Sequence, residues 1–287
     1  GCQVSEHKVD FPERTITWMY GSQSQFSQAR LVLNCVAELR RAKDTAEFFE
    51  GLPALEQQLW VDDALRRLQV PSPEDNVPYI CLLDSGINRG HAMLAPVLHQ
   101  QDMHTVNDAW GVNDTANHGT GLAGVAIYGD MIDALSSTDA IEVGHRLESV
   151  KLTPNYGANV GDAKQHAYLF SSAVTRPEIL NGQRKRIFSS AVTATAYRDF
   201  GRPSAWSSMV DSLAVDALAE TPFPRLFVLS AGNIVDRDHW GNYPASLSVN
   251  QIHDPGQSWN ALTVGAFTDK VELNEPEFIP VADQGAL

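Results

Sequence analysis

Residues 79–86 read YICLLDSG, an apolar run that ends in an acidic residue, a serine and a glycine. A second run of this kind, RLFVLSAGN, occupies residues 225–233. Both runs are apolar throughout rather than alternating, which is typical of strands covered on both faces, as in parallel α/β sheets. Functional groups collect at the carboxyl ends of such strands. Asp84 and Asn233, which follow directly after the two runs, are therefore candidates for one site.

Other segments extend the same α/β pattern. Residues 147–152 and 261–267 are also predicted to be strands. The small residues within 120–127 predict a helix whose backbone packs closely on a sheet. We therefore expect an α/β domain with a mostly parallel sheet flanked by helices.

The chain before residue 77 has a different character. Apolar residues at helical spacing predict amphipathic helices at residues 25–42 and 54–69. A stretch with three prolines at residues 70–78 suits a linker. This predicts a small helical N-terminal domain at residues 1–76 and a larger α/β domain at residues 77–287. The predicted helices either pack against the larger domain or bind a protein partner.

Composition excludes some classes of function. The chain of 287 residues has a net charge of −14, which disfavours nucleic-acid binding because phosphates require clustered Lys and Arg. No apolar run is long enough to span a membrane. The cysteines, which are Cys2, Cys35 and Cys81, form neither a disulfide framework nor a CxxC pair. This favours a reducing, cytoplasmic compartment, and Cys81 is expected to be a small core residue.

Three short motifs follow one another along the chain: LLDSG at residues 82–86, NHGTG at 117–121 and LSAGN at 229–233. Asp84 and His118 are 34 positions apart (118 − 84). In this order the motifs resemble the subtilisin-like serine protease family, whose triad runs Asp, His, Ser along the chain. The resemblance covers residues 78–269.

The resemblance implies a subtilisin-like fold and a serine endopeptidase that hydrolyses polypeptides through an acyl-enzyme without a cofactor. By this resemblance His118 would be the general base and Asp84 would orient its imidazole. Asn233 would donate its side-chain amide to the developing oxyanion. Taken singly, each of the three residues also suits a helix cap, a buried core position or a turn.

The resemblance also extends to substrate binding. Ser190, Ala191 and Gly232 would line the substrate cleft. Met93 stands near the place of the family's common calcium-binding Asp, so a calcium site of that kind is not supported. Gly121 stands where many members have a second His, which leaves the base itself unaffected.

One part of the family pattern is missing. No Gly-Thr-Ser motif, which carries the nucleophile in this family, is present in the 287 residues. Only 54 residues follow Asn233 (287 − 233). We therefore expect the chain to stop before the nucleophilic serine, and we predict that it has no peptidase activity by itself.

Three alternatives remain. The first is a noncatalytic subtilisin-like module that serves binding or regulation. The second is a phosphate-handling α/β protein using Asp84, which is disfavoured because no P-loop or GxGxxG motif is present. The third is a metal site at His91, His99 and His104 with Asp102, whose spacings match no common ligand pattern.

Overall fold

The computed structural model describes most of the chain. The described residues are 3–10, 15–22, 25, 26, 36, 51–135, 139–155, 165–194, 201–218, 224–235, 239, 242 and 245–266. None of the helices within these residues is long and apolar enough to cross a membrane.

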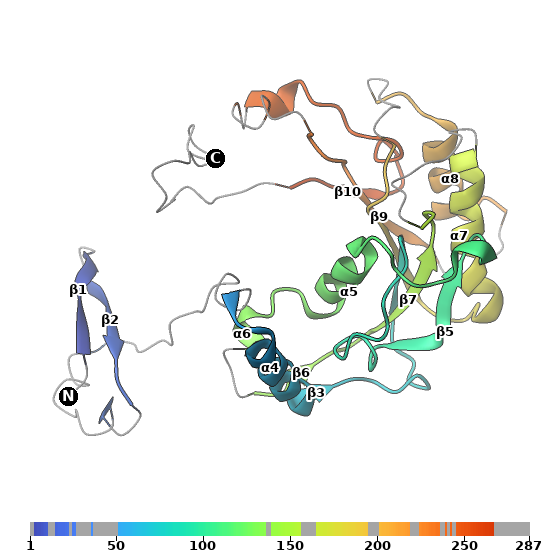
Figure 1. Ribbon diagram of the computed structural model, residues 1–287. Coiled ribbons are helices and arrows are strands. Elements are labelled where there is room, and N and C mark those ends of the chain that lie inside the picture. Colours follow the sequence, from blue (N-terminus) through green and yellow to red (C-terminus); the bar gives the residue numbers. More distant parts are fainter. Residues whose placement is uncertain are drawn as a thin grey trace.

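The centre of the molecule is a six-stranded sheet in the order β10-β9-β8-β4-β7-β5, and each neighbouring pair is parallel (Figure 1). Its strands are β4 (Tyr79–Asp84), β5 (Leu98–Thr105), β7 (Arg146–Lys151), β8 (Arg186–Ser190), β9 (Leu226–Ser230) and β10 (Leu262–Val264). The predicted α/β class with a mostly parallel sheet is confirmed. So are the predicted strands that became β4, β7 and β9.

Helices cover the sheet on both sides (Figure 1). Helix α5 (His118–Tyr128) lies on one face, whereas α7 (His166–Leu180) and α8 (Ala205–Ala214) lie on the other. Successive residues of β4 point to opposite faces, so Leu83 packs in the cluster beneath α7 and α8 while Leu82 packs in the cluster beneath α5. Strand β4 thus contributes to the hydrophobic cores on both sides of the sheet.

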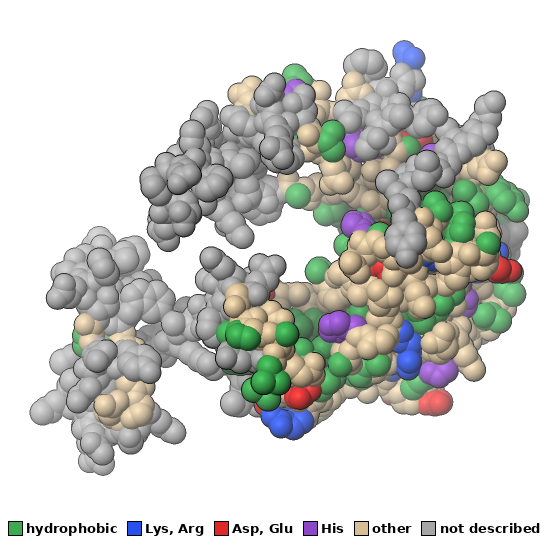
Figure 2. Space-filling model, in the orientation of Figure 1, with side chains coloured by type: hydrophobic (Ala, Val, Ile, Leu, Met, Phe, Trp, Pro, Cys, Tyr) green, Lys and Arg blue, Asp and Glu red, His purple; other side chains and the backbone are tan. Residues whose placement is uncertain are grey.

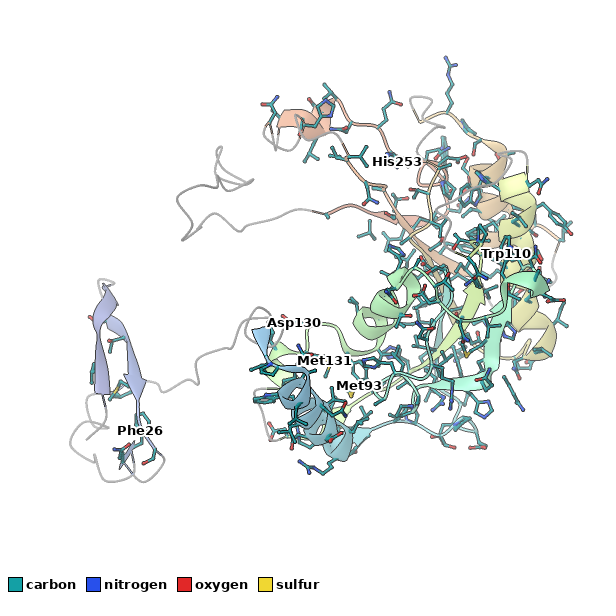
Figure 3. All side chains as sticks on the ribbon, in the orientation of Figure 1. Phe26, Met93, Trp110, Asp130, Met131 and His253 are labelled. Carbon is teal, nitrogen blue, oxygen red and sulfur yellow. The ribbon has the colours of Figure 1, made fainter. Side chains whose placement is uncertain are left out.

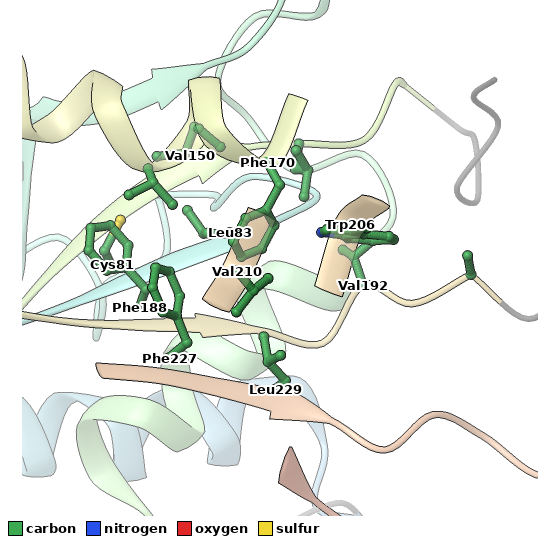
Figure 4. Packing of buried hydrophobic residues seen from close by; sticks show 14 residues of the cluster. Cys81, Leu83, Val150, Phe170, Phe188, Val192, Trp206, Val210, Phe227 and Leu229 are labelled. Carbon is green, nitrogen blue, oxygen red and sulfur yellow. The ribbon is translucent and has the colours of Figure 1, made fainter. Parts of the chain in front are cut away.

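The larger core cluster lies between the sheet and the α7–α8 pair (Figure 4). The rings of Phe188 and Phe227 stack at 5.3 Å, and Phe170 reaches Phe227 from α7 at 5.7 Å. Cys81 is fully buried in this cluster, as predicted, and burial raises the pKa of its thiol well above the ordinary value. Ring contacts of this kind add to the apolar area that holds helix and sheet together.

Three long elements of the α/β domain were missed by the sequence analysis, namely β5, α7 and α8. Strand β5 is an edge strand with three exposed polar residues in succession, so it has no apolar run to reveal it. Helix α8 begins at Ala205, where the sequence analysis predicted no element. Its signal was the reciprocal pair of hydrogen bonds between Ser204 and Ser207, which caps the helix start.

The N-terminal segment differs from the prediction. Strands β1 (Gln3–Asp10) and β2 (Thr15–Tyr20) form an antiparallel hairpin, so the description of residues 1–76 as helical is corrected. The physical reason lies in the second strand, which is rich in β-branched and aromatic residues. The helix predicted at 25–42 lies outside the described residues except for positions 25, 26 and 36.

The second predicted helix is present as α4 (Ala54–Arg67), and it packs on the α/β domain. Arg67 donates to the carbonyl oxygens of Ala134 and Asp139 at 3.0 and 2.7 Å, while Asp63 holds its Nε at 2.9 Å. Next to it, β3 (Leu68–Gln69) pairs in parallel with β6 (Ile141–Glu142). Hydrophobic side chains are nevertheless exposed over α4 (Figure 2). The hydrogen bonds of Arg67 favour packing against the domain as one role for α4.

A buried ionic cluster lies beneath the sheet, toward the amino ends of the strands. The carboxylate of Glu148, with no exposed surface, accepts from Nε and Nη2 of Arg186 at 2.6 and 2.9 Å. Nη1 of Arg184 donates to Glu148 at 2.8 Å and to Asp102 at 2.6 Å. Removing one partner of such a pair leaves an uncompensated buried charge.

The Glu148→Gln variant should therefore lose about 3–5 kcal/mol of unfolding free energy, because two guanidinium groups lose their shared counter-charge. Urea denaturation measures this loss. Glu74→Gln, at an exposed site, is the control and should leave the midpoint unchanged. Equal midpoints for the two variants would show that the cluster contributes nothing.

Candidate active site

Asp84 is the last residue of β4, at the carboxyl edge of the sheet. Its carboxylate is 3% exposed, and Oδ1 accepts from the backbone N–H of Ser85 at 2.7 Å. The backbone carbonyl of Asp84 accepts from the N–H of Leu152 at 2.6 Å. Backbone hydrogen bonds at the end of the strand therefore position this residue independently of any partner side chain.

His118 is the first residue of α5, and its ring contacts Asp84. Nδ1 of His118 lies 2.8 Å from Oδ1 of Asp84. The His118 side chain is 55% exposed, in contrast to the buried carboxylate. The preceding residue, Asn117, has φ +62°, which turns the chain sharply into the helix. A buried acid thus holds one nitrogen of an imidazole that is open on its other side.

Two glycines allow this close approach. A Cβ at Gly119 would lie 2.2 Å from the carbonyl oxygen of Gly86, and 3.3 Å from Oδ1 of Asp84. Gly86 itself has φ +95°, and a Cβ there would lie 2.5 Å from the carbonyl oxygen of Val112. Gly119 is therefore required by the contact between the end of β4 and α5, and Gly86 by the close approach of the loop that carries Val112.

A buried carboxylate that the sequence analysis missed supports the same junction. Asp114 accepts from Oγ of Ser85 at 2.8 Å, from N and Oγ1 of Thr120 at 2.8 and 2.7 Å, and from N of Ala116 at 2.8 Å. Burial alone would raise the pKa of Asp114, but these hydrogen bonds outweigh it and hold the pKa below its ordinary value. The acidic residue shortly before a helix start was the available signal.

Lys151 ends β7 beside this network, and its side chain is buried. Its Nζ donates to the backbone carbonyl of Asn113. Burial lowers the pKa of the Lys151 ammonium, while the nearby Asp114 carboxylate opposes that shift. The loop that carries Asn113 and Asp114 is thus held from both β4 and β7.

The third motif follows β9. Gly232 has φ +101°, and a Cβ there would lie 2.3 Å from the ring of His253. The backbone N–H of His253 donates to the carbonyl oxygen of Ala231. Asn233 has an exposed side chain. Because β9 and β4 are parallel and separated only by β8, Asn233 leaves the same edge of the sheet as Asp84. His253 was missed by the sequence analysis.

Ser190 and Ala191 stand at the end of β8, between the other two strand ends. The Ser190 hydroxyl is buried and donates to the carbonyl oxygen of Leu83 at 3.2 Å. Ala191 is half-buried. Slightly further on, Oγ1 of Thr193 lies 3.4 Å from Nδ1 of His253. The Ser190 side chain therefore links two strands.

The histidines considered for a metal site are not gathered into one. Asp102 pairs with Arg184, and among the residues that the structure describes no group of three or more His, Cys, Asp or Glu side chains is arranged to hold a metal ion. Met93, at the place of the family's calcium-binding Asp, is buried.

The glycines of α5 provide a test of the junction. Gly119→Ala should displace α5 from β4 and lower the unfolding free energy by about 1–3 kcal/mol, because the new methyl overlaps a backbone oxygen. Gly124→Ala is the matched control: no atom lies within 4 Å of its Cβ position, so it should stabilise the helix by about 0.5–1 kcal/mol. Thermal unfolding measures both, and equal effects would contradict the tight contact.

Asp114 provides a test by pH. Its folded pKa is depressed, so the ionised form stabilises the fold above the unfolded pKa of about 4, and this contribution is lost as pH falls through the folded value. Asp114→Asn should lose about 1–3 kcal/mol at pH 7 and show a flatter stability profile below pH 4. Asp108→Asn, at an exposed position, is the control. A profile for Asp114→Asn parallel to that of the wild type would refute this role.

Comparison with known proteins identifies the family to which the chain is similar. The model of the subtilase family (peptidase S8) matches residues 75–284. No curated protein is significantly similar in sequence. Among solved structures, the chain resembles the epidermin leader peptide processing serine protease (EpiP) from Staphylococcus aureus, with 14% identity and a TM-score of 0.43. A point mutant of that protease matches with 13% identity and a TM-score of 0.40.

Each of these alignments covers 95% of this chain and 66% of the solved chain. The family match is the stronger finding, because it extends over most of the chain and includes Asp84, His118 and Asn233. The chain belongs to the subtilase family of serine proteases.

Proposed function

We propose that the chain provides the acid, the base and the oxyanion donor of a serine endopeptidase. The observation that carries this proposal is the 2.8 Å contact between Nδ1 of His118 and the buried carboxylate of Asp84. With a proton on Nδ1, the other ring nitrogen, Nε2, has a free lone pair on the exposed side of the imidazole. That is the form a general base requires.

The proposed reaction is peptide-bond hydrolysis in two steps. Nε2 of His118 takes the proton of a serine hydroxyl as its oxygen attacks the carbonyl carbon, and then gives that proton to the leaving amine. Asp84 stabilises the imidazolium that forms in between. The Asn233 amide donates to the oxyanion of each tetrahedral intermediate. Water then hydrolyses the acyl-enzyme by the same proton transfers, and no cofactor or metal takes part.

The proposed substrate is a polypeptide that lies along the ends of β8 and β9, against Ser190, Ala191 and Gly232. The Ser190 hydroxyl is already hydrogen-bonded to the carbonyl oxygen of Leu83. We therefore assign the contact of Ser190 with the substrate to its backbone. The positive φ of Gly232 and the His253 ring beneath it support a fixed turn next to Asn233. A fixed turn suits an oxyanion donor, which has to be held in place before charge develops.

The nucleophile is the remaining part. None of the serines in the sequence lies in a Gly-Thr-Ser motif, so we propose that the 287 residues alone do not hydrolyse peptides. This missing motif is also the one observation that favours the second candidate, a noncatalytic subtilisin-like module for binding or regulation. Joining these residues to a Gly-Thr-Ser segment separates the two, because only the peptidase becomes active.

The tautomer of His118 tests the proposal on the chain itself. ¹⁵N NMR at pH 8 should place its proton on Nδ1, because the Asp84 carboxylate accepts there. Asp84→Asn should move the proton to Nε2, since an amide N–H donates to Nδ1 instead. Asp108→Asn is the control and should leave the spectrum of His118 unchanged.

In a protein that also carries the Gly-Thr-Ser segment, Asp84→Asn should lower kcat by about 10⁴-fold, and Asn233→Ala should lower it by about 10²–10³-fold. Asn260→Ala, at an exposed site, should keep full activity. Peptide hydrolysis that persists at the wild-type rate in His118→Ala would exclude the proposed base.

A further inference from the structure

The turn that carries Asn233 is held by a segment further along the chain. The backbone N–H of His253 donates to the carbonyl oxygen of Ala231 at 3.0 Å. The His253 ring also packs directly on Gly232, where an added Cβ would lie 2.3 Å from both Cγ and Nδ1 of the ring. The His253 residue is 3% exposed. The residue before Asn233 therefore has a buried imidazole against its Cα, with no room for a side chain between them.

The same imidazole reaches the end of the neighbouring strand. Nδ1 of His253 lies 3.4 Å from Oγ1 of Thr193, three residues after Ser190 at the end of β8. The next residue, Ala194, donates its backbone N–H to the carbonyl oxygen of Asp254 at 2.8 Å. Figure 3 shows His253 on the segment that leads into β10. One side chain thus lies between the strand end proposed to bind the substrate and the turn proposed to carry the oxyanion donor.

The segment that carries His253 is anchored on other elements. The Asp254 carboxylate accepts from the hydroxyl of Ser204, which caps α8, at 2.5 Å and from Nε2 of Gln257 at 2.9 Å. The N–H of Gly256 donates to the carbonyl oxygen of His253 at 2.7 Å. A group that acts in catalysis has to be held by neighbours whose own positions are locked by packing and hydrogen bonds. This segment provides support of that kind to the turn after β9.

We propose that His253 is a positioning residue that fixes the Asn233 amide relative to a substrate bound along the end of β8. This inference rests on the proposed function, in which Asn233 is the oxyanion donor. His253 does not touch the reacting atoms. Its ring sets the place of Gly232, and the backbone carries that placement to the next residue. A displacement of about 1 Å in a group that acts on the transition state can lower the rate by about 10²-fold.

The order of the turn can be measured on the 287-residue chain by ¹⁵N relaxation. In the wild type, the backbone amides of Gly232 and Asn233 should have order parameters of about 0.85, the value of a rigid backbone. In His253→Ala, both should fall below about 0.6, because the ring that packs on Gly232 is gone. The backbone N–H of residue 253 can still donate to Ala231 in this variant, so the change reports on the ring.

His145→Ala is the matched control. This half-buried histidine also makes a ring hydrogen bond, between Nε2 and the carbonyl oxygen of Ala126 at 2.9 Å, but it contacts α5 instead of the turn after β9. Its removal should leave both order parameters unchanged. His253→Asn keeps Cβ, Cγ and a polar atom in the place of Nδ1, which are the three atoms nearest to Gly232, and should restore both values to about 0.85.

Thermal unfolding checks that each variant is folded. Should His253→Ala fail to fold, Thr193→Val takes its place, because it removes only the hydroxyl next to Nδ1 and leaves the ring present. The order parameter of Gly232 should then fall below the wild-type value, and an unchanged value would overturn the inference.

Kinetics of the protein that also carries the Gly-Thr-Ser segment test the link to Asn233. His253→Ala should lower kcat by about 10–10²-fold and change KM by less than about 2-fold, because an oxyanion donor acts in the transition state. In an Asn233→Ala background, His253→Ala should lower kcat by less than about 2-fold further, because the amide that it positions is already gone. A general loss of stability would instead lower kcat in both backgrounds alike.

The inference and the proposed function can fail separately. Order parameters that keep their wild-type values in a folded His253→Ala variant would overturn the positioning role, whether or not the longer protein hydrolyses peptides. Losses of kcat in His253→Ala and Asn233→Ala that simply multiply would overturn it as well. A turn that becomes mobile in His253→Ala, in a longer protein without peptidase activity, would reject the peptidase function alone.

Discussion

The hydrogen bond between His118 and Asp84 joins the carboxyl end of β4 to the first residue of α5. The strand end and the helix start can come this close only where no side chain intervenes, which is why a glycine, Gly119, follows His118. The contact fixes where the helix begins and how it crosses the sheet. The packing of α5 on the sheet and of the loop before it follows from that placement.

Several buried polar groups around the junction are paired with one another, although Oδ2 of Asp84 is buried without a hydrogen-bond partner among the described residues. The Ser85 hydroxyl accepts a hydrogen bond from the N–H of Gly119 and donates one to the Asp114 carboxylate. Asp114 also accepts from the N–H of Thr120, in the first turn of α5. Lys151 binds the backbone of the same loop from β7. A buried carboxylate with several donors stays ionised and rigid. These residues touch the imidazole only through their neighbours, so their effect is to hold its position.

Local pattern predicted the centre of the fold well. The runs of β4 and β9 are apolar; both faces of β4 are largely buried, whereas the face of β9 that carries Leu226 is partly exposed. Asp84 ends the first run and Asn233 follows the second. Pattern failed where tertiary context decides: β5 is a polar edge strand, and the β1–β2 hairpin precedes the segments with helical spacing. His253 was missed for a related reason, because Thr193 and Gly232 are brought to it only by folding. Asp114, which binds Ala116 and Thr120 close by in sequence, did have a local signal.

The glycines of α5 differ in what surrounds them. Gly119 is required, because any side chain there would overlap the carbonyl oxygen of Gly86, two residues after β4. Gly121 and Gly124 have no neighbour within 4 Å, so no contact forbids a side chain there. A glycine inside a helix destabilises it by about 0.5–1 kcal/mol relative to alanine. Close packing therefore accounts for Gly119 alone, and no contact among the described residues accounts for Gly121 or Gly124.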